Sequence, residues 1–135
     1  MLGMEDAEHE ETAPTAPTLL VSKLSCSLAG KAQTIKILSG SLLHRAYGCD
    51  EVTEQFACSY GLNPQFRNKF DKGRLKVSGT DHDGEARAVE MLDHPFYVAT
   101  LFVPQVSSQP GNPHPLIISY LKAALSRQIE EGETY

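Results

Sequence analysis

The densest group of side chains that could do chemistry lies near the start of the chain. Residues 5–11 contain five of the 17 acidic residues, and His9 lies among them. Carboxylates bind amines and other cations, and a histidine beside them could act as a base or as a ligand. An acidic run is also typical of a solvated protein surface. Both interpretations of His9, Glu10 and Glu11 stay open from composition alone.

The three cysteines, Cys26, Cys49 and Cys58, are neither an even set nor spaced to bind a metal. The chain has no CxxC and no HxxxH pattern, so we expect reduced thiols and no metal site. If Cys58 is buried, it is an inert core residue; a nucleophilic thiol there is the alternative. No glycine-rich phosphate-binding motif occurs, and we expect no cofactor.

Composition limits the class of protein. With 135 residues, 41% of them hydrophobic, the chain is long and apolar enough for one packed domain. The formal charge of −5 argues against a nucleic-acid partner. The apolar runs are too short to cross a membrane, and no secretory signal pattern opens the sequence. We therefore expect no membrane partner.

The first half of the chain is predicted to contain mostly strands. Residues 5–18 read as the acidic segment followed by a linker interrupted by prolines. Alternating apolar residues predict strands at 19–25 and 33–38, and we expect these two strands to form a hairpin. Residues 42–47 read as helical turns ending at a glycine, and residues 51–59 as a further strand.

The second half is predicted to be a helix, three strands and a closing helix. Asn63 as N-cap and Pro64 at the first helical position indicate a short helix that ends at Gly73. Strands at 75–79 and 86–91 are expected to join across an Asp-Gly turn. The remaining elements are a central strand at 97–102 buried on both faces, a helix from Pro115 with apolar residues at helical spacing, and a polar tail at 129–135.

Four segments carry a resemblance to one family. Residues 93–105 read DHPFYVATLFVPQ, residues 4–11 read MEDAEHEE, residues 54–63 read EQFACSYGLN, and residues 111–116 read GNPHPL. In this order and spacing they resemble the glutamine amidotransferase domain of CTP synthases. The resemblance implies an α/β fold, the C-terminal portion of a flavodoxin-like class I amidotransferase domain, with a mixed sheet flanked by helices. It extends over most of the chain, so we assign residues 1–128 to this partial domain and 129–135 to the tail.

The resemblance also implies where the catalytic groups of such a domain would lie. The family ends its motif with His and Glu, and the corresponding positions here are Val103 and Gln105. Valine takes no proton and the glutamine amide does not titrate, so a Cys-His-Glu relay cannot be completed at these positions. The family's nucleophilic Cys lies on a turn upstream of the segment that matches residues 4–11. This chain would therefore be the C-terminal part of a domain, a truncated form.

Substrate-binding positions can be carried over in the same way. The family's Glu that binds the substrate's α-amino group corresponds to Glu11, with Glu10 as the competitor if the register shifts by one. The family's Arg that binds the substrate carboxylate corresponds to Ser59, which offers no charge-assisted fork. His9 is a further candidate, either as a displaced base or as a ligand. These residues favour a small amine or an amino-acid-like ligand.

Two functions from different classes follow. The first is a non-hydrolysing pseudoenzyme related to the ligases of pyrimidine nucleotide biosynthesis, which binds a small ligand or regulates a partner. The second is a longer CTP synthase-like enzyme, glutamine-dependent or with altered chemistry, whose nucleophile lies upstream and whose base is His9 or a Glu of the acidic run. Because a partial sheet exposes an apolar edge, we also expect a homodimer or a partner that supplies the remaining half-domain.

Overall fold

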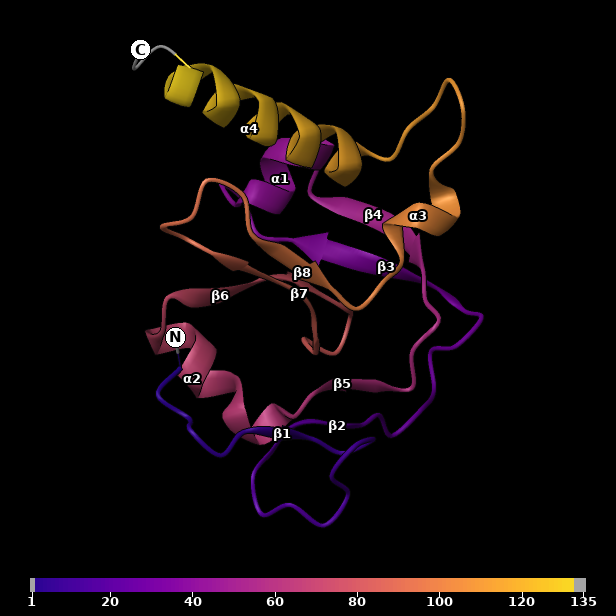
Figure 1. Cartoon of the computed structure of the whole chain (residues 1–135). Helices are drawn as coiled ribbons and strands as arrows, with labels where there is room; N and C mark the ends of the chain where they lie inside the picture. The colour runs from indigo at the N-terminus through magenta and orange to yellow at the C-terminus, as the bar shows by residue number, and fades with distance from the viewer. Residues whose placement is uncertain (1, 133–135) are drawn as a thin grey trace.

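The computed structural model describes residues 2–132 and contains two β-sheets with helices around them (Figure 1). The larger sheet consists of β3 (Ala32–Ile37), β4 (Glu51–Gln55), β6 (Leu75–Thr80), β7 (Ala86–Met91) and β8 (Val98–Thr100). Its strand order is β4-β3-β6-β7-β8, and all neighbours are antiparallel. The smaller sheet consists of β1 (Glu8–His9), β2 (Leu19–Lys23) and β5 (Tyr60–Leu62). In it β2 lies between a parallel β1 and an antiparallel β5.

The helices are α1 (Leu42–Tyr47), α2 (Arg67–Lys72), α3 (Pro104–Ser107) and α4 (Pro115–Gly132), and a 3-10 turn at Pro64–Phe66 precedes α2. Figure 1 shows α1 and α4 on one side of the larger sheet, and the smaller sheet on the opposite side. The predicted α/β class, with sheets flanked by helices, is confirmed.

The main core lies between the larger sheet and the helices α1 and α4. Ile35 from β3 and Leu43 from α1 are completely buried, and Phe56, Phe102 and Leu116 surround them. Ile35 and Ile37 lie two residues apart in a strand, so both face this core while Lys36 between them faces solvent. The alternating pattern that predicts a strand here therefore also predicts its buried face.

The local signals for α1 are confirmed. Ser41 Oγ accepts a hydrogen bond from the His44 backbone N–H at 2.9 Å, and Gly48 ends the helix in the left-handed conformation. A further cap comes from far away in the sequence. The buried Glu90 carboxylate of β7 accepts hydrogen bonds from the backbone N–H groups of Leu42 and Leu43, at 3.0 and 3.2 Å.

The hairpin predicted between residues 19–25 and 33–38 is wrong. Both strands exist, but β2 pairs with β1 and β5, whereas β3 pairs with β4 and β6. Residues 24–31 between them pass from one sheet to the other and hydrogen-bond to residues 56–59 on the way. Alternation specifies which face of a strand is buried, but it does not specify which strand lies beside it.

The single strand predicted at 51–59 is also wrong. β4 ends at Gln55, Phe56 forms an isolated bridge with Phe102, and β5 begins at Tyr60 in the other sheet. The chain therefore changes sheets within this segment, and Ser59 lies in the connection.

The strand predicted at 97–102 is present but shorter, and it is not central. β8 covers Val98–Thr100 and pairs on one side with β7, so it is the edge of the larger sheet in the described part of the chain. Ala99 is exposed, and Val98 and Thr100 are half-buried. The unbroken apolar run indicated a strand buried on both faces, but only Phe102 beyond its end is fully buried.

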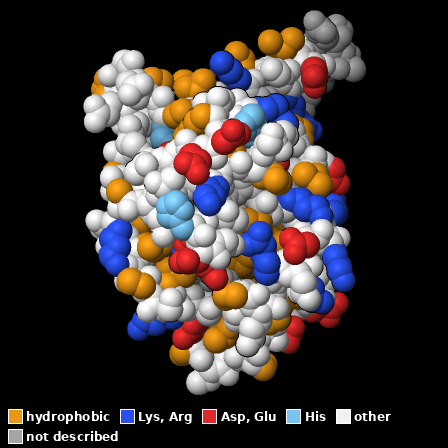
Figure 2. Space-filling model, turned by 180° about the vertical axis from the view of Figure 1, so that it is seen from behind, with side chains coloured by type: hydrophobic (Ala, Val, Ile, Leu, Met, Phe, Trp, Pro, Cys, Tyr) orange, Lys and Arg blue, Asp and Glu red, His pale blue; other side chains and the backbone are white. Residues whose placement is uncertain are grey.

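Other elements agree with the sequence. β6 and β7 form the predicted hairpin, and Asn63 caps the 3-10 turn by accepting a hydrogen bond from Gln65 N–H. The closing helix continues to Gly132, past the start of the tail predicted at Ile129, and residues 133–135 of that tail lie outside the described residues. Its apolar residues are largely uncovered: Tyr120, Leu121, Leu125 and Ile129 are each more than half exposed. Figure 2 shows hydrophobic side chains at the surface along this helix, at the top of the view.

Candidate functional site

The segment that carries Val103 and Gln105 is held firmly against the larger sheet. Phe102 bridges to Phe56, and the Val103 backbone N–H donates to the Gln55 carbonyl at 3.0 Å. Pro104 then begins α3, with Val103 as its N-cap residue. The Val103 side chain is half-buried and Gln105 is exposed. Neither side chain titrates, so this turn presents no general acid or base at these two positions.

A buried polar cluster lies beneath α3. The Glu54 carboxylate of β4 accepts hydrogen bonds from the Tyr47 hydroxyl of α1, from His114 Nε2 at 2.8 Å, and from Ser107 Oγ of α3 at 3.4 Å. His114 Nδ1 in turn accepts a hydrogen bond from the Leu116 backbone N–H, so its proton is on Nε2. Glu54 and His114 are only 5% and 4% exposed. The cluster joins α1, β4, α3 and the start of α4, and it positions the turn that bears Val103.

Sequence reasoning missed this cluster, although one signal was present. Glu54 lies two residues after Val52 and two before Phe56, so all three side chains lie on the same face of the strand. A carboxylate in phase with core residues requires buried hydrogen-bond donors. Here those donors come from three other elements.

The cluster has a measurable pH signature. Burial raises the pKa of Tyr47 above its usual range, and the hydrogen bond to Glu54 raises it further. The tyrosine hydroxyl of the unfolded chain has a pKa of about 10. Because the pKa is higher in the folded protein, the stabilisation from this hydroxyl is fully present below that pH and is lost as the pH rises above it. We expect the difference in unfolding free energy between wild type and Tyr47→Phe to shrink from pH 9 to pH 11. Urea unfolding at each pH measures it, with Tyr120→Phe, an exposed tyrosine, as the control. A difference that stays constant across this range contradicts the assignment.

Ser59 lies where the chain passes between the sheets. Its carbonyl accepts a hydrogen bond from Leu24 N–H at 2.9 Å, and its Oγ is 2.7 Å from Ser27 Oγ. The side chain is thus half-buried and engaged with the 24–28 loop. A hydroxyl in this position can form neutral hydrogen bonds but supplies no positive charge to a carboxylate.

The acidic segment is partly structural. The Glu10 carboxylate accepts a hydrogen bond from the Lys23 backbone N–H, which ties it to the end of β2. Glu11 is exposed, and its carboxylate has no hydrogen-bond or ion-pair partner among residues 2–132. Of the two glutamates, Glu11 is therefore the one whose side chain is available to a ligand.

His9 packs against Tyr60, with ring centroids 5.2 Å apart, so it lies close to the connection that contains Ser59. Its Nδ1 accepts a hydrogen bond from the Glu11 backbone N–H at 3.1 Å. In the neutral ring this leaves the proton on Nε2, which is then a donor. In this arrangement the Nε2–H of His9 can donate a hydrogen bond to a ligand.

The predicted positions thus gather around one stretch of chain, residues 55–60. Val103 hydrogen-bonds to Gln55 at its start, Ser59 lies near its end, and His9 contacts Tyr60. The roles of these residues and of Glu10, Glu11 and Gln105 in binding stay predictions.

The three cysteines are all free thiols. Cys26 and Cys49 are exposed and Cys58 is half-buried, with its thiol near the Tyr60 carbonyl at 3.1 Å; none forms a disulfide. Within residues 2–132 no three His, Cys, Asp or Glu side chains group as a metal site. In that same part of the chain no helix is long and apolar enough to span a bilayer.

Curated proteins similar to this chain are CTP synthases. No protein-family model matches the chain. CTP synthase from Rhodococcus jostii is 33% identical over 148 aligned positions, and CTP synthase from Bifidobacterium longum is 35% identical over 144. These alignments cover 96% and 95% of this chain but only 25% and 26% of the relatives, so the chain spans about a quarter of their length.

Solved structures show the same fold. The glutaminase domain of Trypanosoma brucei CTPS with bound acivicin superposes with a TM-score of 0.86 and 23% identity. The superposition covers 93% of this chain and 53% of that domain. A putative GMP synthase subunit from Thermoplasma acidophilum superposes with a TM-score of 0.59 and 13% identity. The flavodoxin-like class I amidotransferase fold predicted for the chain is therefore confirmed.

Proposed function

Because this chain belongs to the CTP synthase family, as a relative of its glutamine amidotransferase domain, we propose that it binds a small ligand without hydrolysing glutamine through a Cys-His-Glu relay. The proposal rests on Val103 and Gln105, which the family resemblance places at the positions of the family's His and Glu. Neither side chain can accept or donate a proton during catalysis. The protein would act as a pseudoenzyme in the cytoplasm, as the family resemblance implies.

Two of the neighbouring titratable groups, Glu54 and His9, are already engaged in hydrogen bonds within the described residues. The Glu54 carboxylate lies behind α3, where it is buried and accepts hydrogen bonds from Tyr47, His114 and Ser107. His9 uses its Nδ1 lone pair on the Glu11 backbone. The exposed Glu11 carboxylate is the remaining candidate base near this site, and the proposal is that it binds a ligand without taking a proton from it.

The ligand at this site would be an amine or a similar cation. Glu11 presents an exposed carboxylate for an ammonium group, whereas Ser59 supplies no positive charge for a carboxylate. This combination favours the amino end of an amino-acid-like molecule over its carboxyl end. A regulatory role through ligand binding fits these groups better than turnover.

A partner is part of the proposal. The apolar side chains Tyr120, Leu121, Leu125 and Ile129 of α4 are more than half exposed, and β8 has a neighbour on one side in the described part of the chain. The solved glutaminase domain extends beyond the region that this chain covers. We expect the α4 surface to contact a second copy of the chain or a polypeptide that supplies the other part of such a domain.

The test is glutamine hydrolysis by the gene product purified from its native cells, with its intact mass determined first. Glutamate release is measured beside a CTP synthase as positive control, and light scattering of the same sample reports its oligomeric state. We expect no glutamate above the heat-inactivated blank. Glutamate release that is proportional to protein concentration and disappears in His9→Gln or Glu11→Gln would overturn the proposal. It would favour an enzyme with altered chemistry and an upstream nucleophile.

A further inference from the structure

A cavity of about 580 Å³ with charged and apolar lining residues lies between the two sheets, away from α3. One wall is the end of β2 with the 24–28 loop, and the other is the hairpin that joins β6 and β7. The 24–28 loop also hydrogen-bonds Ser59 through Leu24 and Ser27. It therefore borders this cavity while it holds the connection that contains Ser59.

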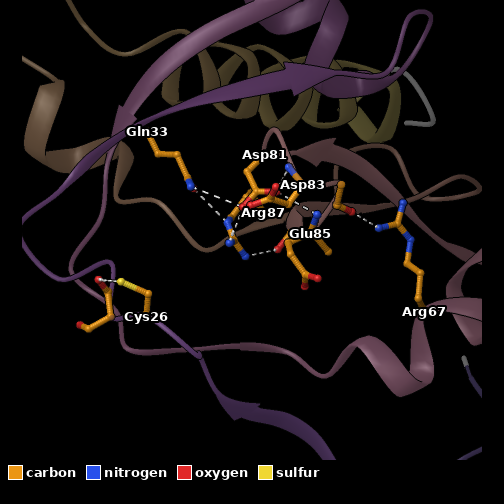
Figure 3. Close-up of polar contacts among 10 residues, drawn as sticks. Cys26, Gln33, Arg67, Asp81, Asp83, Glu85 and Arg87 are labelled. Atoms are coloured by element: carbon orange, nitrogen blue, oxygen red, sulfur yellow. Dashed lines mark hydrogen bonds and ion pairs between the residues drawn. The ribbon is translucent and has the colours of Figure 1, made fainter.

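The floor of the cavity is a buried arginine. Arg87 is 6% exposed, and its Nη2 donates to Asp81 Oδ2 at 2.7 Å. Its Nε donates to Gln33 Oε1 at 3.1 Å, and its Nη1 donates to the Ala86 carbonyl at 3.1 Å. Figure 3 shows the guanidinium between Gln33 and the Asp81 turn, with Cys26 on the segment below it.

This guanidinium has donors to spare. Arginine carries five N–H groups, and the three bonds above use one each on Nε, Nη1 and Nη2. One N–H on Nη1 and one on Nη2 thus have no acceptor among the described residues. A buried donor without an acceptor is costly, and two such donors on one guanidinium match the two oxygens of a carboxylate.

The rim of the cavity carries both signs of charge. Lys23 and Lys31 contribute ammonium groups, and Asp83 and Glu85 contribute carboxylates. The backbone N–H groups of Asp83 and Glu85 donate to Asp81 Oδ1 at 3.0 and 2.9 Å, which fixes the turn and leaves both carboxylates without a hydrogen-bond partner in the described chain. The floor pair Arg87 and Asp81 is neutral, and the rim charges also balance.

We propose that this cavity binds a small zwitterion. The ligand's carboxylate would accept the two remaining N–H groups of Arg87, and its ammonium would lie against Glu85 and Asp83. A simple anion would leave the Asp83 and Glu85 carboxylates without a hydrogen-bond donor from the ligand, and a simple cation would leave the two remaining Arg87 donors unused. This site is separate from the Glu11 position, and it requires neither the presence nor the absence of glutamine hydrolysis.

The probes are the unbranched ω-amino acids from glycine to 6-aminohexanoate, whose length sets the separation of the two charges. Each is titrated calorimetrically into the whole protein, and the thermal midpoint is followed in parallel. We expect one length to bind best. Analogues of that ω-amino acid that carry only the carboxylate or only the ammonium should bind at least about tenfold more weakly than the ω-amino acid itself. Equal binding of a single-charge analogue, or no binding by any length, overturns the proposal.

Variants place the binding in the cavity. Because Arg87→Met leaves Asp81 buried without its cation and can unfold the protein, the primary variants are Glu85→Gln and Lys31→Met at the rim. Their matched controls are Glu51→Gln and Lys36→Met, exposed residues of β4 and β3 outside the cavity. We expect Glu85→Gln to weaken binding about tenfold and Lys31→Met to weaken it less, with both controls within about twofold of wild type. If Glu11→Gln abolishes binding while Glu85→Gln binds as tightly as wild type, the ligand lies at the acidic segment and the assignment is refuted.

Discussion

Asp81→Asn should lower the free energy of unfolding by about 3 kcal/mol, because it leaves the buried Arg87 charge without its counter-ion. The side chains of Arg87 and Asp81 are 6% and 4% exposed, and Arg87 Nη2 lies 2.7 Å from Asp81 Oδ2. Asn keeps the Oδ1 acceptor that the Asp83 and Glu85 backbone N–H groups use, so the turn itself is preserved. What it changes is Oδ2, which becomes an NH2 group facing the N–H donors of Arg87 and Gln33.

The matched control is Asp83→Asn, in the same turn but exposed. Urea unfolding followed by circular dichroism measures both variants, and we expect the control to change stability by less than about 0.5 kcal/mol. The double variant Asp81→Asn with Arg87→Met removes the uncompensated charge and should recover part of the loss. If Asp81→Asn costs no more than Asp83→Asn, the pair is not a buried ion pair in solution.

Local signals in the sequence were sufficient wherever an element is determined by its own residues. Ser41 and Gly48 mark both ends of α1, and the Asp81–Gly84 turn joins β6 to β7, as predicted. In each case the hydrogen bonds that decide the conformation lie within a few residues of one another. Such local interactions can be read from composition and spacing.

Strand neighbours could not be read in this way. β2 and β3 both alternate, but they belong to different sheets, and the chain between them is held by residues 56–59. β8 is apolar without alternation, yet it forms an edge because only β7 lies beside it in the described chain. Pairing depends on contacts between residues distant in sequence, whereas the pattern within a strand reports only which faces are buried.

The residues of the candidate site also differ in whether the sequence could identify them. Val103, Gln105, Ser59 and Glu11 were assigned because family motifs surround them, and the fold that those motifs implied is confirmed. The Glu54 cluster and the Arg87 floor were not found. Glu54 and His114 are 60 residues apart, and Arg87 meets Gln33 across 54 residues. A buried polar network is visible in sequence only as a charged residue at a core-facing position, and its partners appear only in the fold.

The Glu54 cluster provides the second large effect. Glu54→Ala should lower the free energy of unfolding by about 3 kcal/mol, because it removes the buried acceptor that three donors of the cluster share. These are the Tyr47 hydroxyl, His114 Nε2–H and Ser107 Oγ–H. Glu51→Ala, in the same strand but exposed, is the control and should change stability by less than about 0.5 kcal/mol.

The two variants should also differ in where the structure loosens. Ser107 lies in α3 and donates to Glu54, so loss of the Glu54 carboxylate removes one of the contacts that hold this turn against the larger sheet. Hydrogen exchange should show faster exchange of the amides at 103–108 in Glu54→Ala than in Glu51→Ala, under conditions where both remain folded. Amides of β6 and β7 should keep their protection in both. If exchange at 103–108 is unchanged, Glu54 contributes to global stability without positioning α3, and the turn that bears Val103 and Gln105 is held by its backbone contacts alone.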